Sequence, residues 1–388
     1  MSYQSANSYF PAKFVTSLSI VGNYQKSAAR IYDTFLFDGE LDLLEHRLRQ
    51  NYVDTDFFVL VEAGETYRGE DKLFHYLSHQ ERFSWAADKL RTLQLARLGG
   101  PSSSPKQRAQ VQRNAILFAL RDAGPEDIVL LLDSDEIPSV SLLQRLHAEG
   151  LQEPHRLQMT RHYQKLDLLA PASTCCVDTS LPFAFAANHS VPETWGELKS
   201  LWSGRSGVAA PVKSLLESSP FWLRFGPEEK PVIADAGRHL TAIDPSAQLS
   251  SKLGRVFHAE WATGRGMHLP HLLRCEEHAV HHRGWWYAER SPGDLPEDLR
   301  RLATACPTTL RHSPLPPVWK RSAVRTWAWA RTSTAFSDKT VRWIDLHFDE
   351  LLPLLSLPLL CAGIARSLLA RLLRGRRRQS TEEGHLHH

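Results

Sequence analysis

The chain lacks several features that would place it at once in a broad class of protein. It contains no run of about twenty apolar residues, so we expect no conventional transmembrane helix. Its first 23 residues show no basic start followed by an apolar stretch, and we therefore expect no signal peptide. The formal net charge of +3 is too small to indicate binding to nucleic acid, and we expect no such partner.

Cysteine is also scarce, with five residues in 388. An odd number without the spacing of a zinc knuckle or a disulfide framework predicts reduced thiols. Reduced thiols are typical of the cytoplasm, which is the predicted location.

The most informative stretch that is present is the apolar run 128–132, which leads directly into Asp133-Ser134-Asp135-Glu136. Such a run is typical of a fully buried parallel strand, and ligands bind at the carboxyl ends of parallel strands. Two carboxylates spaced Asp-x-Asp repel each other unless a cation lies between them. The pattern predicts an enzyme that holds a phosphate ester through Mg²⁺ or Mn²⁺, and a nucleotide-sugar fits best.

Two other interpretations of this stretch stay open. Acidic residues are common in turns and as caps of a following helix, here expected over 139–147. Phosphatases of the haloacid dehalogenase type also place Asp-x-Asp after a strand. They require Thr or Val two residues after the second Asp, where this chain has Ile137.

Apolar periodicity predicts strands that alternate with helices, and therefore a parallel sheet with crossover helices. Strands are expected over 30–37, 56–62, 90–98, 128–133 and 156–166, and helices from 41, over 106–123, over 139–147 and from 244. Residues 170–230 have weak periodicity and predict a loop-rich region.

Several segments between residues 31 and 260, taken together, are similar to one known family. They are Ile31-Tyr32-Asp33-Thr34-Phe35, 37–48, 57–69, Gln112-Arg113-Asn114, 133–138, 236–240, Lys252 and His258-Ala259-Glu260. In these segments the chain resembles glycosyltransferase family 17, which includes the β-1,4-mannosyl-glycoprotein β-1,4-N-acetylglucosaminyltransferases. The resemblance implies a GT-A-like fold, a UDP-sugar donor and inversion at the anomeric carbon. Family members usually have Trp where Arg238 stands here.

The fold class that follows is α/β, with a GT-A-like, Rossmann-type, mostly parallel sheet flanked by helices and a helical basic C-terminal tail. We expect an irregular leader over 1–28 and a transferase domain over 29–290, with a donor half at 29–167 and an acceptor half at 168–290. A helical extension over 291–350 and an amphipathic basic tail over 351–388 complete the prediction.

The resemblance and the acidic edge together predict the metal ligands. Asp135 is the best candidate, and Asp133 either shares the ion or contacts the ribose. Glu136 is expected to orient a metal-bound water. His258 can complete the shell of Mn²⁺ or Mg²⁺, or can instead be a buried, hydrogen-bonded histidine.

Further residues are candidates for the donor site and for catalysis. The predicted donor-binding residues are Asp33, Glu62, Arg113, Asp133 and His239. For Arg113 a structural salt bridge is the alternative, and for His239 a buried structural role. The general base that activates the acceptor should be a carboxylate, either Glu260 or Asp235.

Two aromatic and imidazole clusters are weaker candidates. Five histidines between 268 and 282 have His-x-x-His spacings that suit zinc, but an exposed polar segment explains them better. Trp285-Trp286-Tyr287 can stack on a sugar or pack in a core.

The tail bears on the acceptor. Residues 366–378 contain six arginines and no acid, and leucines recur between them at helical spacing. This pattern predicts a surface helix on an anionic membrane, with a packed terminal helix as the alternative. We therefore expect a bacterial enzyme on the inner face of the cytoplasmic membrane, with a glycan or lipid-linked glycan acceptor. The rival functions are a metal-dependent phosphotransferase or phosphatase, and an inactive glycan-binding protein.

Overall fold

The structure of the protein is a computed structural model. It describes residues 29–169, 203–241, 243, 274–275, 288–289, 292–310, 316, 320–321, 323–324, 327 and 337–351. The predicted leader, the basic tail and the expected helix from residue 244 lie outside these residues, so those predictions stay open.

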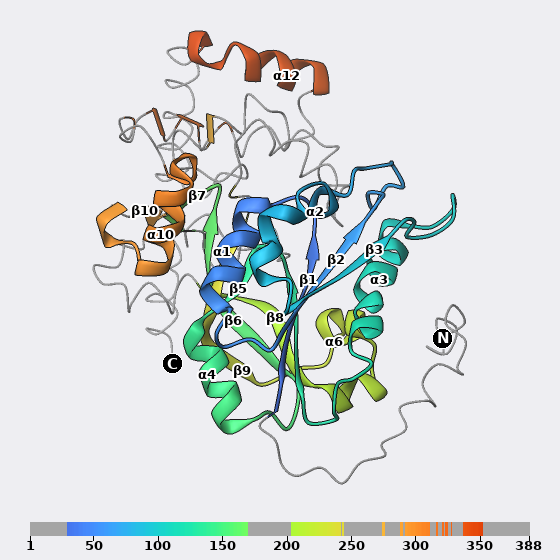
Figure 1. Ribbon diagram of the computed structural model, residues 1–388. Helices are drawn as coiled ribbons and strands as arrows, with labels where there is room; N and C mark the ends of the chain where they lie inside the picture. The colour runs from blue at the N-terminus through green and yellow to red at the C-terminus, as the bar shows by residue number, and fades with distance from the viewer. Residues whose placement is uncertain are drawn as a thin grey trace, which may run out of the picture.

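Within the described residues, ten strands form one sheet that helices cover on both faces (Figure 1). The strands are β1 (Ile31–Phe37), β2 (Phe57–Ala63), β3 (Leu90–Leu95), β4 (Ile128–Asp133), β5 (Glu136–Pro138), β6 (His155–Tyr163), β7 (Lys165–Leu169), β8 (Ser203–Pro211), β9 (Val232–Thr241) and β10 (Ala288–Glu289). The α-helices are α1 (Leu41–Asn51), α2 (His75–Ser78), α3 (Pro105–Asn114), α4 (Val140–Glu149), α6 (Pro220–Phe225), α10 (Glu297–Ala305) and α12 (Asp338–Leu346). Short 3₁₀ helices are η3 (Gln80–Ala86), η4 (Ala115–Ala119), η6 (Val212–Leu216), η8 (Pro292–Asp294) and η9 (Pro307–Thr309).

The sheet order is β10-β7-β6-β8-β4-β1-β2-β3, with β9 beside both β6 and β5. Strands β4, β1, β2 and β3 are parallel, as predicted from the alternation of strands and helices. Beyond β4 the pairing is antiparallel, except for the parallel pair β6 and β9. The α/β class is therefore confirmed, and the parallel pairing is concentrated in the first half of the chain.

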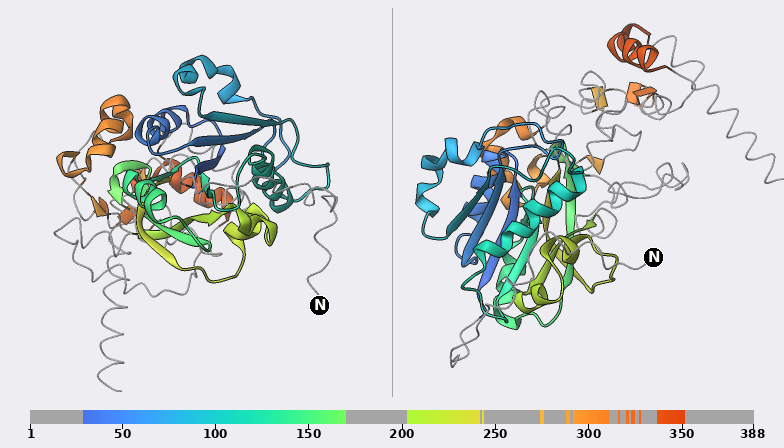
Figure 2. Two further views of the ribbon diagram at one scale, coloured as in Figure 1. Left: turned by 60° about the horizontal axis from the view of Figure 1, so that its bottom comes forward. Right: turned by 90° about the vertical axis from the view of Figure 1, so that its right-hand side faces the viewer.

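Side chains of the parallel strands alternate between two cores, because successive residues of a strand face opposite sides of the sheet. On β4, Ile128, Leu130 and Leu132 pack with α1, η3 and α4, whereas Val129 and Leu131 pack with η4 and α6. Figures 1 and 2 show α1 and α4 on one face of the sheet and α3 and α6 on the other. Burial on both faces explains why β2 and β4 are nearly continuous apolar runs up to their terminal acids.

Three local predictions differ from the structure. The expected helix over 106–123 is α3 followed by the tighter turn of η4, and it ends before residue 120. The expected strand over 156–166 is divided into β6 and β7 at Gln164, which has a φ of 64°. The region expected to be loop-rich contributes β8, which pairs with β4 in the middle of the sheet. Weak periodicity there reflects a strand with small residues rather than the absence of a strand.

Two smaller clusters of apolar side chains lie outside the main cores. Helix α10 packs Leu299 and Leu302 against Leu43, Ile137 and residues of β7 and β9. Around α12, Val341 and Phe348 pack with Trp327 and Cys275. The predicted domain limits stay a prediction, although the proposed donor and acceptor halves share one sheet through β4 and β8.

Candidate active site at the carboxyl edge of the parallel strands

The parallel register brings three acidic strand ends to one edge of the sheet. Leu36 pairs with Asp133 and Phe37 pairs with Glu62, so these two acids lie beside the end of β1, and Asp38 directly follows that strand. This is the edge at which open α/β sheets bind ligands. The structure therefore places the Asp133 motif where the sequence predicted a site.

Asp133 lies between two arginines. Arg113 on α3 contacts Oδ1, and Nη2 of Arg224 on α6 donates to Oδ2 at 2.6 Å. Both guanidinium groups are also anchored to the backbone of β4, at 2.7 Å from Arg113 Nη1 to the carbonyl of Leu132 and at 2.8 Å from Arg224 Nη1 to that of Leu131. The two arginine side chains are almost fully buried, whereas 39% of the Asp133 side chain is exposed.

Glu136 completes this group from the first residue of β5. Its Oε2 accepts from the backbone N–H of Asp133 at 2.9 Å, and its Oε1 accepts from Arg224 Nη2 at 2.9 Å. The side chain is 1% exposed. Glu136 therefore holds Arg224 and the turn at 133–136 in place. Its expected role in orienting a metal-bound water stays a prediction.

The charges around Asp133 decide its protonation. Burial alone would raise the pKa of Asp133, but the guanidinium groups of Arg224 and Arg113 outweigh burial and hold that pKa well below its usual range. Asp133 and Glu136 in turn raise the pKa of Arg224 despite its burial. Asp133 therefore stays a carboxylate throughout the physiological pH range.

Asp135 and His239 meet on the other side of the motif. The antiparallel pairing of β5 with β9 sets His239 opposite Glu136. His239 Nε2 lies 3.6 Å from Asp135 Oδ1, and Nδ1 lies 3.3 Å from Ser206 Oγ on β8. Asp135 and His239 are 15% and 12% exposed, so a ligand at this edge can reach both.

The metal prediction can be compared with this geometry. Within the described part of the chain, no group of three or more His, Cys, Asp or Glu side chains is arranged to hold a metal ion. Mg²⁺ sites that act on phosphate substrates often use one or two carboxylates and take other ligands from water and substrate phosphates. Asp135 fits such a site, Asp133 is engaged by arginines, and His258 lies outside the described residues.

Asp33 has a different partner from the one expected. It is completely buried, and both its oxygens accept from Arg47, with Nε at 2.8 Å from Oδ2. Arg47 Nη1 also donates to the carbonyls of Asp133 and Ser134, at 3.1 and 3.3 Å. Direct contact with the nucleoside stays a prediction; in this structure Asp33 supports the turn that carries the acidic motif.

Glu62 is likewise used within the protein. It is completely buried and accepts from the backbone N–H groups of His75 and Tyr76, at the start of α2. Burial raises its pKa, and these hydrogen bonds oppose the rise. Glu62 therefore holds the segment after β2 in place, and its contact with a donor stays a prediction.

Of the two candidates for the general base, only Asp235 lies in the described residues. It is exposed, with a φ of 52°, and precedes His239 by four residues on β9. It lies within an irregularity of the β6–β9 pairing, between Ile233 and Gly237, and its backbone carbonyl accepts from Ser139 Oγ at 3.2 Å, so Asp235 lies beside the residue that follows β5. Glu260 lies outside the described residues, as do the histidines 268–282 and residues 285–287.

Sequence reasoning missed Arg224 and Ser206, which come from the region expected to be loop-rich. No sequence signal links Arg224 to Asp133, because 91 residues separate them. Arg238 on β9 pairs with Asp298 on α10, with 2.8 Å between Nε and Oδ2. This ion pair links β9 to α10 next to the candidate site.

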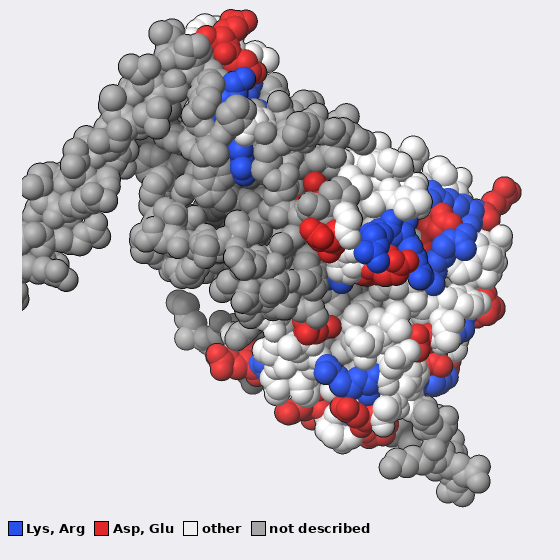
Figure 3. Space-filling model, turned by 90° about the vertical axis from the view of Figure 1, so that its left-hand side faces the viewer, with Lys and Arg blue, Asp and Glu red and all other residues white. Residues whose placement is uncertain are grey.

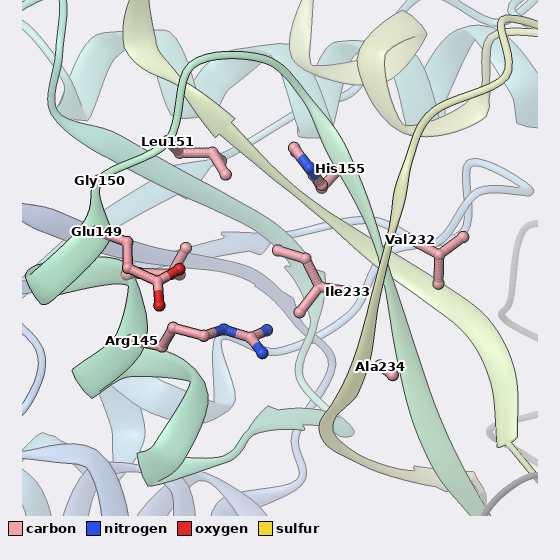
Figure 4. A pocket seen from close by; sticks show the side chains of 9 residues that line it. Arg145, Glu149, Gly150, Leu151, His155, Val232, Ile233 and Ala234 are labelled. Carbon is pink, nitrogen blue, oxygen red and sulfur yellow. The ribbon is translucent and has the colours of Figure 1, made fainter.

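A separate groove of about 380 Å³ lies at the far end of α4 and β9 (Figure 4). It is lined by Arg145, Leu146, Glu149, Gly150, Leu151, His155, Val232, Ile233 and Ala234. Val232 precedes His239 by seven residues on β9, so the groove is remote from the acidic motif. Arg145 and Glu149 lie side by side in its lining (Figure 4). We assign no ligand to this groove.

On the face shown in Figure 3, positive and negative side chains intermingle over the described surface. On α1 and η3, for example, Arg82 pairs with both Asp42 and Glu45. No helix among the described residues has the length and apolar character needed to cross a bilayer.

One part of the chain matches a known protein family. Residues 15–171 match the profile of glycosyltransferase family 17, which confirms the resemblance noted in the sequence. The matched region contains β1 to β7 and the motif Asp133-Ser134-Asp135-Glu136. The class of protein that this region indicates is a glycosyltransferase.

No curated protein sequence matches the chain. Among solved structures, one similar chain is described as mannosyltransferase PcManGT from Pyrobaculum calidifontis in complex with GDP-Man and Mn²⁺. It has 13% sequence identity, covers 91% of both chains and gives a TM-score of 0.32. At that TM-score the likeness carries no argument about fold, donor or metal.

Proposed function

We propose that this protein is a metal-dependent, inverting glycosyltransferase that transfers a sugar from a UDP-sugar, GlcNAc or a related hexose, to a glycan or lipid-linked glycan. The observation that carries the proposal is the convergence of five side chains at one sheet edge. Asp133, Asp135 and Arg113 lie in the region that matches the family, and Arg224 and His239 join them from later in the chain.

The charges of this edge suit departure of a nucleoside diphosphate. Glycosyl transfer leaves two phosphates whose negative charge must be stabilised as the bond to the sugar breaks. Arg113 and Arg224 supply fixed positive charges next to the motif. Asp135 would hold Mn²⁺ or Mg²⁺, which would act as a Lewis acid on the diphosphate. The base that deprotonates the acceptor stays assigned to Glu260 or Asp235.

We further propose that the protein acts at the inner face of the cytoplasmic membrane. What supports this is the sequence of the tail, in which the six arginines of 366–378 are accompanied by four leucines at helical spacing. Basic segments gain affinity from each cationic residue near an anionic bilayer. A lipid-linked glycan acceptor would be presented at that surface.

The test of the proposed reaction is donor binding by the full-length protein with and without metal. Thermal shift and calorimetry would compare UDP-GlcNAc, UDP-glucose and GDP-mannose, each with Mn²⁺ or with EDTA. We expect one UDP-sugar to bind with Mn²⁺, and we expect Asp135→Asn to weaken that binding about tenfold or more, because a charged metal ligand is lost.

Asp294→Asn is the control for loss of one surface carboxylate, since Asp294 is exposed and lies in η8, outside the motif. It should bind the donor as the wild type does. Unchanged Mn²⁺-dependent binding in Asp135→Asn would reject the metal assignment. Donor hydrolysis without need of an acceptor would favour the phosphatase class, and no binding of any donor would favour an inactive glycan-binding protein.

A further inference from the structure

The two arginines beside Asp133 are held in place independently of that carboxylate. Arg113 donates to the carbonyl of Leu132, and Arg224 donates to the carbonyl of Leu131 and to Glu136. Each guanidinium thus keeps an anchor on β4 or β5 if Asp133 turns away. The aromatic ring of Phe225 lies below both groups, 5.7 Å from Arg113 and 5.3 Å from Arg224 at the guanidinium carbons.

Asp133 differs from its neighbours in exposure. Its side chain is 39% exposed, against 1% for Glu136 and at most 6% for the two arginines. Its carboxylate therefore lies on the solvent side of the arginine pair and covers the N–H groups that point towards it. Rotation of this one side chain would open those N–H groups to a ligand at the sheet edge.

The charge balance favours an anion as that ligand. When Asp133 leaves, Arg224 keeps Glu136 as a charged partner. Among the described residues, the other hydrogen-bond partner of Arg113 is the carbonyl of Leu132, which carries no charge. A buried guanidinium without a counter-charge is unfavourable. Phosphate oxygens match the two-pronged donor geometry of arginine as well as a carboxylate does.

We propose that Arg113 and Arg224 form a diphosphate-binding pair whose place Asp133 fills until the donor binds, and that the diphosphate exchanges with the Asp133 carboxylate. This inference rests on the proposed function and extends it. Asp133 then acts as a placeholder that keeps the arginine pair assembled, and is released towards the donor or metal when phosphate oxygens take over its hydrogen bonds.

The exchange predicts a gain of affinity in a variant. In EDTA, Asp133→Asn should bind inorganic pyrophosphate about three- to tenfold more tightly than the wild type, because a neutral amide competes less well for the arginines. Arg113→Lys should bind it about tenfold more weakly. Calorimetry on the full-length protein at low ionic strength measures both, and circular dichroism confirms the fold. A gain of affinity cannot result from misfolding.

The chain offers a matched control in Asp122. This aspartate also lies between two arginines, with 2.6 Å from Oδ1 to Arg91 Nη1 and 3.5 Å from Oδ2 to Arg30 Nη1. It precedes β4, at the opposite end of the strand from Asp133. Asp122→Asn should leave pyrophosphate affinity unchanged. An equal gain in Asp122→Asn would show a general charge effect and overturn the exchange.

The two proposals fail in different ways. If the wild type binds a UDP-sugar with Mn²⁺ but Asp133→Asn shows no gain for pyrophosphate, the exchange is wrong and the transferase proposal stands. If the wild type binds no pyrophosphate and no nucleotide-sugar in any condition, both proposals are overturned.

Discussion

At the scale of single residues, two buried ion pairs near the motif fix the shape of the site. Asp33 pairs with Arg47, and Glu136 pairs with Arg224, each pair buried. Removing one partner of such a pair leaves an uncompensated charge and costs about 3–5 kcal/mol. Because Arg47 also binds the carbonyls of Asp133 and Ser134, one buried pair determines how the acidic turn is presented.

Buried histidine makes the stability of the fold dependent on pH. His162 on β6 is completely buried, and Nδ1 lies 2.6 Å from the carbonyl of Leu166. Burial, and then the charge of Arg238, lower the pKa of His162 to about 3, while Asp298 opposes the shift. In the unfolded chain histidine titrates near 6.5. The unfolded state therefore binds more protons between pH 6.5 and 3, so stability falls as pH falls through that window.

We expect this one residue to remove up to about 2 kcal/mol of unfolding free energy between pH 7 and pH 5. Urea unfolding of the wild type and of His162→Gln at both pH values measures the effect, and the variant should show a smaller pH dependence. His155→Gln, at the start of β6, is the control and should follow the wild type. Equal pH dependence in all three proteins would contradict the prediction.

At the scale of elements, the short pair β5 and β9 sets the position of His239. Three residue pairs join these strands, among them Glu136 with His239 and Pro138 with Gly237. The approach is close at Gly237, where an added Cβ would lie 2.1 Å from the carbonyl oxygen of Ile137. Its φ of +147° is also one that side-chain-bearing residues rarely adopt. Glycine at this position is thus required by backbone contact.

Gly237→Ala should therefore lower the free energy of unfolding by about 2–3 kcal/mol, through strain and displacement of β5. Metal-dependent donor binding should weaken with it, because His239 shifts relative to Asp135. Thermal unfolding and calorimetry measure the two effects. Gly100→Ala is the control, since no atom lies within 4 Å of an added Cβ there. Wild-type stability in Gly237→Ala would contradict the assigned close contact.

At the scale of the whole molecule, one sheet joins segments that are far apart in the chain. β8 pairs with β4, and β9 pairs with β6 and β5, so residues after 200 complete a site whose acids precede 140. The Arg238–Asp298 pair and the apolar contacts of α10 extend this assembly to residues near 300. The site therefore depends on the folding of most of the described chain.

The proposed attachment of the whole protein to a membrane depends on its C-terminal tail. Deleting residues 366–388 should release the protein from vesicles that contain anionic lipid, because the six arginines are removed. Flotation with anionic and with neutral vesicles measures this. Deleting only 379–388, which contain no arginine, is the matched control and should leave binding intact. If the protein that lacks residues 366–388 still floats with anionic vesicles, the tail is not the segment that binds the membrane.

The sequence by itself determined the parallel strands and the position of the acidic motif. A strand buried on both faces requires a continuous apolar run, and the runs before Glu62 and Asp133 are recorded directly in the residue order. The resemblance to family 17 rests on the same local segments. These features are local, and periodicity and residue type express them without knowledge of distant contacts.

Only the tertiary structure decided the partners of those acids. Arg224 pairs with Asp133 although 91 residues separate them, and Arg47 pairs with Asp33. Strand β9 places His239 next to Asp135 and the Asp235 carbonyl next to Ser139. Such pairings depend on strand register and on which helix covers which face, and no local pattern in the sequence encodes either. For this reason the position of the acidic motif at the sheet edge was predictable, whereas the charge partners of its residues were not.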